Sequence, residues 1–439
     1  MSQSIPFSLS GTPVSAQFDG PQLTSDGGLC WLAEADTALG LCAALAAQVP
    51  EWRRGPVRHS LETLLRQRVF QIACGYEDQD DADSLRSDPL LKLVCGRLPA
   101  EADLASQPTL SRLENAVDAK ACYRLARALV EVYLAAREQR GVPTHIILDL
   151  DGTDDPAHGQ QEGVAFHGYY GQYMYHPLLI FDGATGQVIT AILRPGTCHA
   201  SRGAVAVLRR LVPLLRARWP GVHIEIRADA GFAVPDLYAY LEAEHLDYTI
   251  GLATNRRLEA LAAPLAAQAA AQRLQTGEKA RLFADTAYQA GSWDQPRRVV
   301  IKAEALAKGL NIRFVLTSRT DAPAALYHWY TQRGDRPELC IKDLKDDCFA
   351  DRLSDHRFWP NQFRLLLHAA AYWLLDTLRR WLAQLQVPHL QLGTLRLQLI
   401  KIGGWIRRRV HGLTLHLASS HPGEVLWYLL ASRPARLRE

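Results

Sequence analysis

The sequence predicts a mixed α/β protein in which helices cover a central sheet. Residues 20–138 carry apolar side chains at helical spacing, and strand-like runs begin near Thr144. From there to about residue 255 the expected order is one strand, a two-stranded hairpin, helix, strand, helix, strand. This alternation is typical of a mixed sheet with helices on its faces.

The N-terminal third is expected to be helical. "LETLLRQRVFQIACGY" and "AKACYRLARALVEVYLAAREQ" have amphipathic helical patterns. Between them, a short helix can begin at Ser87 or Asp88 and end at Gly96, and another can open at Ser106 or Thr109. Two short helices around a loop are compatible with a helix-turn-helix, and equally with a helical bundle that binds no nucleic acid.

The strands of the expected sheet can be read one by one. "THIILDLD" is a strand, and "HPLLIFD" and "VITAILR" form a hairpin around "GATG". "GVHIEIRAD" and "LDYTIGLA" are later strands that follow amphipathic helices. Residues 256–318 break this rhythm with an alanine-rich helix and three strand candidates, which predicts a mostly β insertion. A helix then runs from Leu326 toward Lys345, and a long helix and two short strands close the chain.

Composition bounds the function classes. The chain has 439 residues and eight scattered cysteines without a CxxC pair, which favours reduced thiols in the cytoplasm. We expect neither a membrane span nor a signal peptide. Residues 352–439 contain 13 Lys or Arg against 4 Asp or Glu. Such a basic region indicates either a polyanionic partner or a solvated charged face.

The segment "HIILDLDGTDDPAHG" places four carboxylates within seven positions after a buried strand. Strand alternation puts Asp149 and Asp151 on one face. Asp229 ends a second strand, and Glu338 lies on the helix after the insertion. Three carboxylates from separate parts of the chain, one after each of the two strands and Glu338, could together hold two Mg²⁺ or Mn²⁺ ions, which prefer oxygen ligands. Each also has a structural alternative: an outer group or cap for Asp149, an Asx turn for Asp229, a solvated helix face for Glu338.

Three further residues have alternative interpretations. Asp154 and Asp155 precede a proline and read as turn or cap residues. Trp293, in the insertion, could stack on an unpaired base but reads more readily as core.

One alternative enzyme class is a phosphatase. "ILDLDGT" matches the DxDGT motif of haloacid-dehalogenase-like phosphotransferases. That resemblance implies Asp149 as a nucleophile and Asp151 as an acid/base. It leaves Asp229 without a role and lacks the later carboxylate pair that the mechanism needs.

A second resemblance covers nearly the whole chain. "DGT" and "RADAGF" after strands, and a Tyr-x2-Arg…Glu-x6-Lys helix, resemble the DDE transposases of bacterial insertion sequences. "LTSDGGLCWL", "QPTLSRLEN" and "DDPAHGQQEG" resemble the same group, which carries a β-rich insertion between its second Asp and its Glu. This resemblance implies an RNase H-like core.

The resemblance assigns roles position by position. Asp151, Asp229 and Glu338 match the catalytic, metal-binding acids, and Tyr330, Arg333 and Lys345 match conserved DNA-contacting positions. Four residues separate Arg333 from Glu338 where three are usual, so Arg336 is an alternative to Arg333. Six residues separate Glu338 from Lys345, as the family pattern has it.

The implied organisation has five parts: a helical DNA-binding region at 1–140, the first part of the core at 141–255, the β-rich insertion at 256–318, the rest of the core with the Glu helix at 319–385, and a helical, basic C-terminal region at 386–439. Arg112 would read bases, while Arg407, Arg408 and Arg409 would hold the DNA backbone.

The resemblance implies a transposase that cuts element ends and transfers the strands to target DNA, using two Mg²⁺ or Mn²⁺ ions. Its expected partners are double-stranded DNA at the terminal inverted repeats and the target, with no membrane. A homodimer, associated with the cytoplasmic nucleoid, is expected. A metal-dependent nuclease without strand transfer and a non-catalytic DNA-binding derivative remain alternatives.

Overall fold

The chain divides into two compact units. The computed structural model describes residues 4–157, 159–335 and 337–433. The first unit, called the sheet unit here, comprises Asp118–Asp346 and Ala350–Ala369. The second, the terminal unit, comprises Met1–Val117, Asp347–Phe349 and Ala370–Glu439.

An eight-stranded mixed sheet forms the centre of the sheet unit, in the order β12-β13-β14-β11-β10-β4-β8-β9. The neighbours β4, β10 and β11 run parallel, and the other pairs are antiparallel. This mixed α/β arrangement fits the RNase H-like core expected from the sequence. The strands are β4 His145–Gly152, β8 Leu178–Asp182, β9 Val188–Ile192, β10 His223–Ala228, β11 Asp247–Leu252, β12 Ala280–Tyr288, β13 Arg297–Leu306 and β14 Gly309–Thr317.

Helices connect and flank these strands. Parallel neighbours need a crossover, which α9 supplies between β10 and β11. Residues of β4 that point away from the candidate site, such as Leu148 and Leu150, are fully buried. The helices of this unit before the insertion are α7 Ala119–Glu138, α8 Ala204–Arg218 and α9 Pro235–Ala243, together with the 3₁₀ turn η1 Ala230–Phe232.

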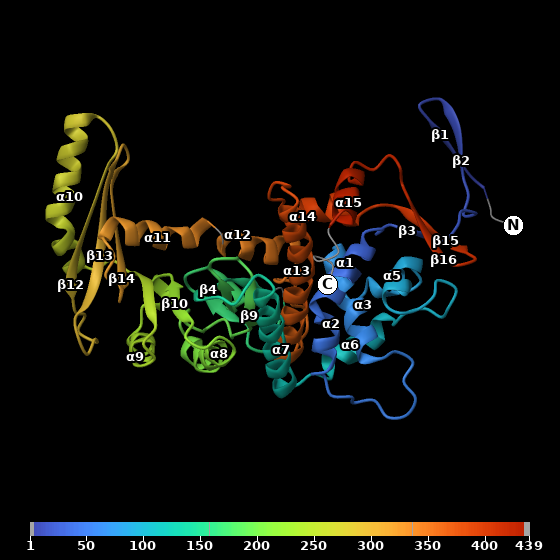
Figure 1. Ribbon diagram of the computed structural model, residues 1–439, viewed down its shortest axis with the longest axis horizontal. Helices are drawn as coiled ribbons and strands as arrows, with labels where there is room; N and C mark the ends of the chain where they lie inside the picture. The colour runs from blue at the N-terminus through green and yellow to red at the C-terminus, as the bar shows by residue number, and fades with distance from the viewer. Residues whose placement is uncertain (1–3, 158, 336, 434–439) are drawn as a thin grey trace. The chain divides into compact units, whose positions relative to one another are not determined.

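The segment 256–318 extends the central sheet. It begins with a 21-residue helix, α10 Arg256–Thr276, which the Asn255 side chain caps. Figure 1 shows α10 alongside β12 and β13, and small alanine side chains form the contact between them. Because β14 pairs with β11, the three inserted strands continue the sheet rather than forming a separate one.

The helix expected from Leu326 toward Lys345 is described as α11 Pro323–Asp335, α12 Pro337–Lys342 and a π-helical turn, Asp343–Asp347. Residue 336, between α11 and α12, lies outside the described residues.

A small three-stranded sheet, of order β5-β7-β6, follows β4 closely in the chain. Its strand β5, Asp155–Pro156, pairs with β7, Gln172–Tyr175, which in turn pairs with β6, Ala165–His167. The β6–β7 hairpin is therefore tied to the segment that directly follows Asp151.

The terminal unit is mainly helical. Asp88 caps α5 through the amides of Leu90 and Leu91, and Ser106 is the N-cap residue of α6, which confirms two expected helix starts. Its helices are α1 Leu29–Leu39, α2 Leu41–Ala46, α3 Leu61–Cys74, α4 Ala82–Leu85, α5 Pro89–Val94, α6 Gln107–Asn115, α14 Leu392–Leu395 and α15 Glu424–Ala431, with a π-helical turn at Arg396–Ile400.

Short strands complete the terminal unit. β1 Ile5–Leu9 and β2 Thr12–Ala16 form an exposed hairpin, and a second sheet has the order β16-β15-β3. Its strands are β3 Leu23–Thr24, β15 Gly404–Arg409 and β16 Gly412–Leu417. The helix α13, Phe358–Gln384, begins in the sheet unit and ends in the terminal unit. Within the described residues, no helix has the length and apolar character needed to cross a bilayer.

Candidate active site

Asp151 and Asp229 lie at the carboxyl ends of two neighbouring parallel strands. In the β4–β10 pair Leu150 lies opposite Ala228, so the next residue of each strand is one of these aspartates. Asp229 then caps the turn η1, accepting a hydrogen bond from the Gly231 amide at 2.8 Å. Sheet geometry thus brings the two carboxylates together at the carboxyl ends of adjacent strands, where open α/β sheets place their ligand-binding sites.

Helix α11 presents Tyr330 and Arg333 to these carboxylates. The two residues are three positions apart and so share one helix face. The Arg333 Nη2 donates to Asp151 Oδ2 at 2.7 Å, and the Tyr330 hydroxyl donates to the Ala228 carbonyl at 3.4 Å. A side chain at Gly251 would meet that hydroxyl, since its Cβ would lie 2.6 Å from the oxygen. Glycine here permits the close approach of Tyr330 to the strand ends.

The electrostatics reflect two acids held close together. Burial raises the pKa of Asp151 to about 7, Arg333 opposes the rise, and the charge of Asp229 adds to it. Burial also raises the pKa of Tyr330 to about 12, and Asp229 and Asp151 contribute to the rise. Tyr330 is therefore a neutral hydroxyl at physiological pH. A site of this kind can hold a cation between its acids and a phosphate against its arginine.

Asp149 serves a different purpose. Both of its oxygens accept hydrogen bonds of 2.7 Å from Arg227, and the pair is buried. Both oxygens are therefore engaged in an internal pair rather than facing a substrate, which disfavours Asp149 as the nucleophile of a phosphatase. The arrangement agrees with the reading of Asp149 as an outer, supporting residue.

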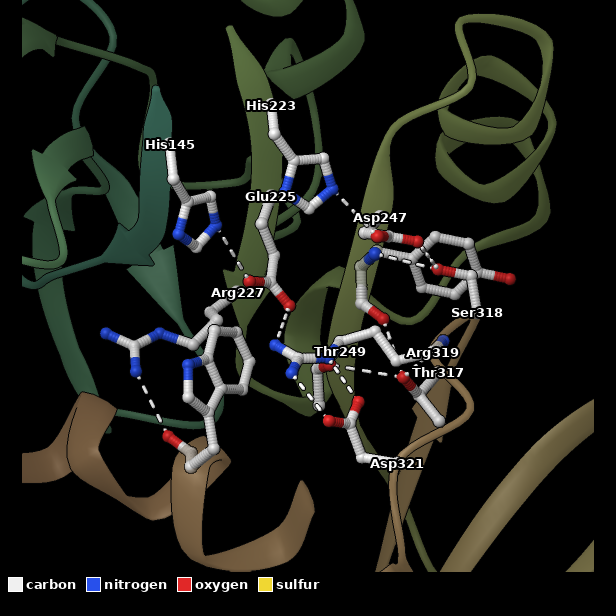
Figure 2. Close-up of polar contacts among 12 residues, drawn as sticks. His145, His223, Glu225, Arg227, Asp247, Thr249, Thr317, Ser318, Arg319 and Asp321 are labelled. Atoms are coloured by element: carbon white, nitrogen blue, oxygen red, sulfur yellow. Dashed lines mark hydrogen bonds and ion pairs between the residues drawn. The ribbon is translucent and has the colours of Figure 1, made fainter. Parts of the chain in front are cut away.

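Arg227 links this pair to α11. Its Nη1 donates to the Trp329 carbonyl at 3.1 Å, and its guanidinium lies 4.7 Å from the centre of the Trp329 ring. Arg319 lies 4.5 Å from the same ring and donates to Glu225 at 2.5 Å. Figure 2 shows Glu225 between Arg319 and His145, which contact its two oxygens. Two arginines, each bound to a buried carboxylate, thus position the helix that carries Tyr330 and Arg333.

Lys345 is paired with an acid that the sequence reading left as a turn residue. The Lys345 ammonium lies 2.7 Å from Asp154 Oδ1, and Gln172 of β7 donates to the other oxygen at 2.9 Å. Burial would raise the pKa of Asp154, but Lys345 and Gln172 outweigh it and lower that pKa. Asp155, the next residue, is buried in β5 and is likewise no cap.

Glu338 is not assembled with the two aspartates. It is exposed in the first turn of α12. Over residues 4–157, 159–335 and 337–433, no group of three or more His, Cys, Asp or Glu is arranged to hold a metal ion. Arg336, the alternative to Arg333, lies outside these residues. The described donor set that suits a divalent cation is therefore the Asp151–Asp229 pair, two hard oxygen ligands with Arg333 supplying positive charge.

The DNA-contact candidates of the terminal unit are exposed. Arg112 lies in the last turn of α6, a helix fixed on α3 by the buried ion pair between Arg68 and Glu114 at 3.0 Å. Arg407, Arg408 and Arg409 are exposed on β15, paired with β16.

Sequence reasoning missed an aromatic group beside the site. The rings of His167, Tyr170 and His176 lie within 5.0–5.9 Å of one another. The His176 ring packs against Gly152, next to Asp151, since a Cβ on that glycine would lie 2.8 Å from its Nε2. Tyr169, 87% exposed, lies at the tip of the same hairpin. The run "FHGYYGQYMY" is the sequence signal that could have indicated this aromatic group.

Trp293, in the insertion, is buried against Tyr238 and Tyr288, as expected for a core residue.

Comparison with known proteins gives the family. No curated protein matches the chain. Among solved structures, a piggyBac transposase in a synaptic complex with hairpin DNA is similar at 14% identity and a TM-score of 0.42, over 86% of this chain and 80% of that one. The model of the family described as transposase DDE domain group 1 matches residues 8–439. Because this match spans nearly the whole sequence, the chain belongs to the DDE transposases of group 1 and is an enzyme of DNA transposition.

Proposed function

We propose that this protein is the transposase of a bacterial insertion sequence, which cuts double-stranded DNA at the terminal inverted repeats and joins the freed ends to target DNA. The observation that carries the proposal is the placement of Asp151 and Asp229 at adjacent strand ends beneath Arg333 and Tyr330. In a DDE transposase, such a pair is suited to divalent-cation chemistry on a phosphodiester.

Asp151 and Asp229 would hold Mg²⁺ or Mn²⁺, two ions in the full site, and Glu338 would join them as the third ligand. Bound there, the cations supply activation of a water or a 3′-hydroxyl and stabilisation of the leaving oxygen. The negative charges of the two aspartates repel each other in the free protein, and this repulsion favours a cation between them.

The remaining residues of the site act on the DNA backbone. Arg333 presents a planar guanidinium that can bind two phosphate oxygens, and Lys345 supplies a point charge. Tyr330, neutral because burial raises its pKa to about 12, can donate a hydrogen bond to a phosphate oxygen. These three residues, the Tyr-Arg-Lys positions of the family motif, would hold the scissile phosphate while the acids hold the cations.

The terminal unit would recognise the element end. Arg112 on α6 would contact base edges. Arg407, Arg408 and Arg409 would bind backbone phosphates whatever the DNA sequence. We retain 1–140 as the DNA-binding region, 141–255 and 319–385 as the catalytic core around the insertion 256–318, and 386–439 as the basic region. Joining two ends calls for a homodimer, acting at the cytoplasmic nucleoid.

The test uses the full chain, DNA bearing an element end, a supercoiled target and Mg²⁺, with products resolved on gels. Asp151→Asn, Asp229→Asn and Glu338→Gln should each abolish cleavage and retain end binding. Glu259→Gln, an exposed glutamate of α10, is the matched control and should cleave normally. Cleavage without joined products would favour a nuclease, and full activity of Glu338→Gln would remove Glu338 from the site.

A further inference from the structure

The terminal unit contains an open cleft of about 480 Å³ that the proposed catalytic chemistry does not use. Three arginines, Arg53, Arg58 and Arg86, line it, and Asp103 is the one acid among its lining residues. The cleft is therefore cationic, unlike the acidic site of the sheet unit.

Two of the three arginines have donors to offer. Arg53 is engaged, because its guanidinium makes two bonds to Glu51 and one to the His59 carbonyl. Arg58 is exposed, and among the described residues its guanidinium makes no hydrogen bond or ion pair. Arg86 approaches Asp103 only at 3.9 Å, where both side chains are partly exposed. Arg58 and Arg86 can thus turn their planar forks toward an anion.

Hydroxyl groups at the start of α6 complete the lining. Ser106 is the N-cap residue, yet its side chain does not cap the helix; its Oγ lies 3.3 Å from Thr109 Oγ1. The Gln107 amide donates instead to Asp83 at 3.2 Å. One of the two hydroxyls donates to the other, so one O–H of the pair remains available as a donor at the positive end of the α6 dipole.

His59 lies among the cations of the cleft. Its Nδ1 lies 3.0 Å from Arg97 Nη2. Since a guanidinium only donates, this nitrogen accepts and the ring is neutral. Burial lowers the pKa of His59 to about 4, and the cations Arg97, Arg58 and Arg53 lower it further. Burial is the larger cause of this lowering, and the contribution of the three cations is the part that would favour an added anion.

We propose that this cleft binds one phosphate of the DNA backbone, held by Arg58 and Arg86 and by one hydroxyl of the Ser106–Thr109 pair. The proposal rests on the proposed function for the identity of the ligand as DNA. A phosphate held here fixes the N-terminal end of α6, the helix whose last turn carries exposed Arg112. The contact would set the register of that helix on the duplex without reading sequence itself.

The test removes charge from both sides of the contact. The cleft variant carries Arg58→Gln and Arg86→Gln together. The control variant carries Arg54→Gln and Arg127→Gln, which replace two exposed arginines outside the cleft. Each is titrated with end DNA in which single phosphates are replaced in turn by neutral methylphosphonates. In wild type and control, one position should weaken binding about tenfold. In the cleft variant that position should have no further effect, and the salt slope should fall by about one.

The outcomes are distinct. End binding without any position coupled to Arg58 and Arg86 overturns the cleft as a phosphate site and leaves the proposed function standing. Failure of wild type to bind end DNA overturns both. A titration with inorganic phosphate, followed by NMR of the His59 ring, tests whether the ligand is free phosphate. Saturation at low millimolar phosphate that is lost in the cleft variant, in the absence of a coupled DNA position, would assign a free-phosphate site. That result would reject the DNA contact.

Discussion

Arg333 of α11 and Asp151 of β4, 182 positions apart in the chain, form a buried ion pair with 2.7 Å between Nη2 and Oδ2. The guanidinium occupies one oxygen of the carboxylate that the proposed mechanism assigns to a cation. A phosphate would give the guanidinium a second anion, and a cation would take over the neutralisation of Asp151. The pair thus offsets one carboxylate charge of the free site until both ligands arrive.

The two aspartates of β4 should respond in opposite ways to substitution. Asp149→Ala leaves Arg227 buried without its counter-charge and should cost on the order of 3–5 kcal/mol of unfolding free energy. Asp151→Asn should cost little stability and abolish cleavage. Chemical denaturation and a cleavage assay measure both. Asp285→Ala, which breaks a half-exposed pair with Arg298, is the control and should cost below about 1 kcal/mol. Wild-type stability of Asp149→Ala would contradict the positioning role.

Lys345 and Asp154 should also separate. Lys345→Met removes a phosphate contact and should weaken binding of end DNA roughly tenfold, since a hydrogen bond to a charged group contributes about 1.5–3 kcal/mol. Asp154→Asn releases the ammonium from its partner and should leave affinity unchanged or higher. Anisotropy titrations measure both. Equal losses in the two variants would mean that the pair is purely structural.

Cation binding can be measured without cleavage. Mn²⁺ binding, followed by electron paramagnetic resonance, should weaken in Asp151→Asn and in Asp229→Asn and persist in Glu259→Gln. Cleavage should stop in EDTA and return with Mg²⁺ or Mn²⁺, while Ca²⁺ should bind without turnover because its geometry is looser. Cleavage that survives EDTA would rule out the two-cation mechanism.

His59 should make stability depend on pH. Its pKa is lowered to about 4 in the folded protein, against about 6.5 in the unfolded chain. As pH falls from about 6.5 to 4, the unfolded chain takes up a proton that the folded protein excludes, so stability is lost, by at most about 1.4 kcal/mol per pH unit. His59→Gln should flatten this slope in denaturation curves between pH 4.5 and 7.5. His411→Gln, an exposed histidine of the same unit, controls for the substitution; an unchanged slope in His59→Gln would refute the assignment.

Base reading and backbone holding should differ in specificity. Arg112→Ala should lower affinity for the element end far more than for random DNA, because a bidentate base contact discriminates by roughly 1–3 kcal/mol. Replacing Arg407, Arg408 and Arg409 together should weaken both DNAs alike and flatten the salt dependence. Titrations of both DNAs at several salt concentrations distinguish the two. Equal loss on both DNAs from Arg112→Ala would move end recognition elsewhere.

Strand alternation was enough to place Asp149 and Asp151 on one face of β4, and the turn after Asp229 could be read from its glycine. The function of Asp149 could not be predicted from the sequence, because it depends on the β4–β10 register that places Arg227 opposite Asp149. Lys345 and Asp154 meet across 191 positions, a contact that no local pattern encodes.

The basic cleft escaped notice for a similar reason. Its arginines come from separate segments, 53–58 and 86, which meet only in the folded terminal unit.

The continuation of the central sheet through β14 has a consequence for engineering this chain. If 256–318 were cut to a short loop, β11 would become an edge strand, with the amides and carbonyls that now pair with β14 left open. Its sequence, DYTIGL, carries a charge only at its first residue, and such an open edge is a template for pairing with a second molecule. The truncated protein should therefore self-associate, eluting early in size-exclusion chromatography, unless a charge or a proline is placed on that strand.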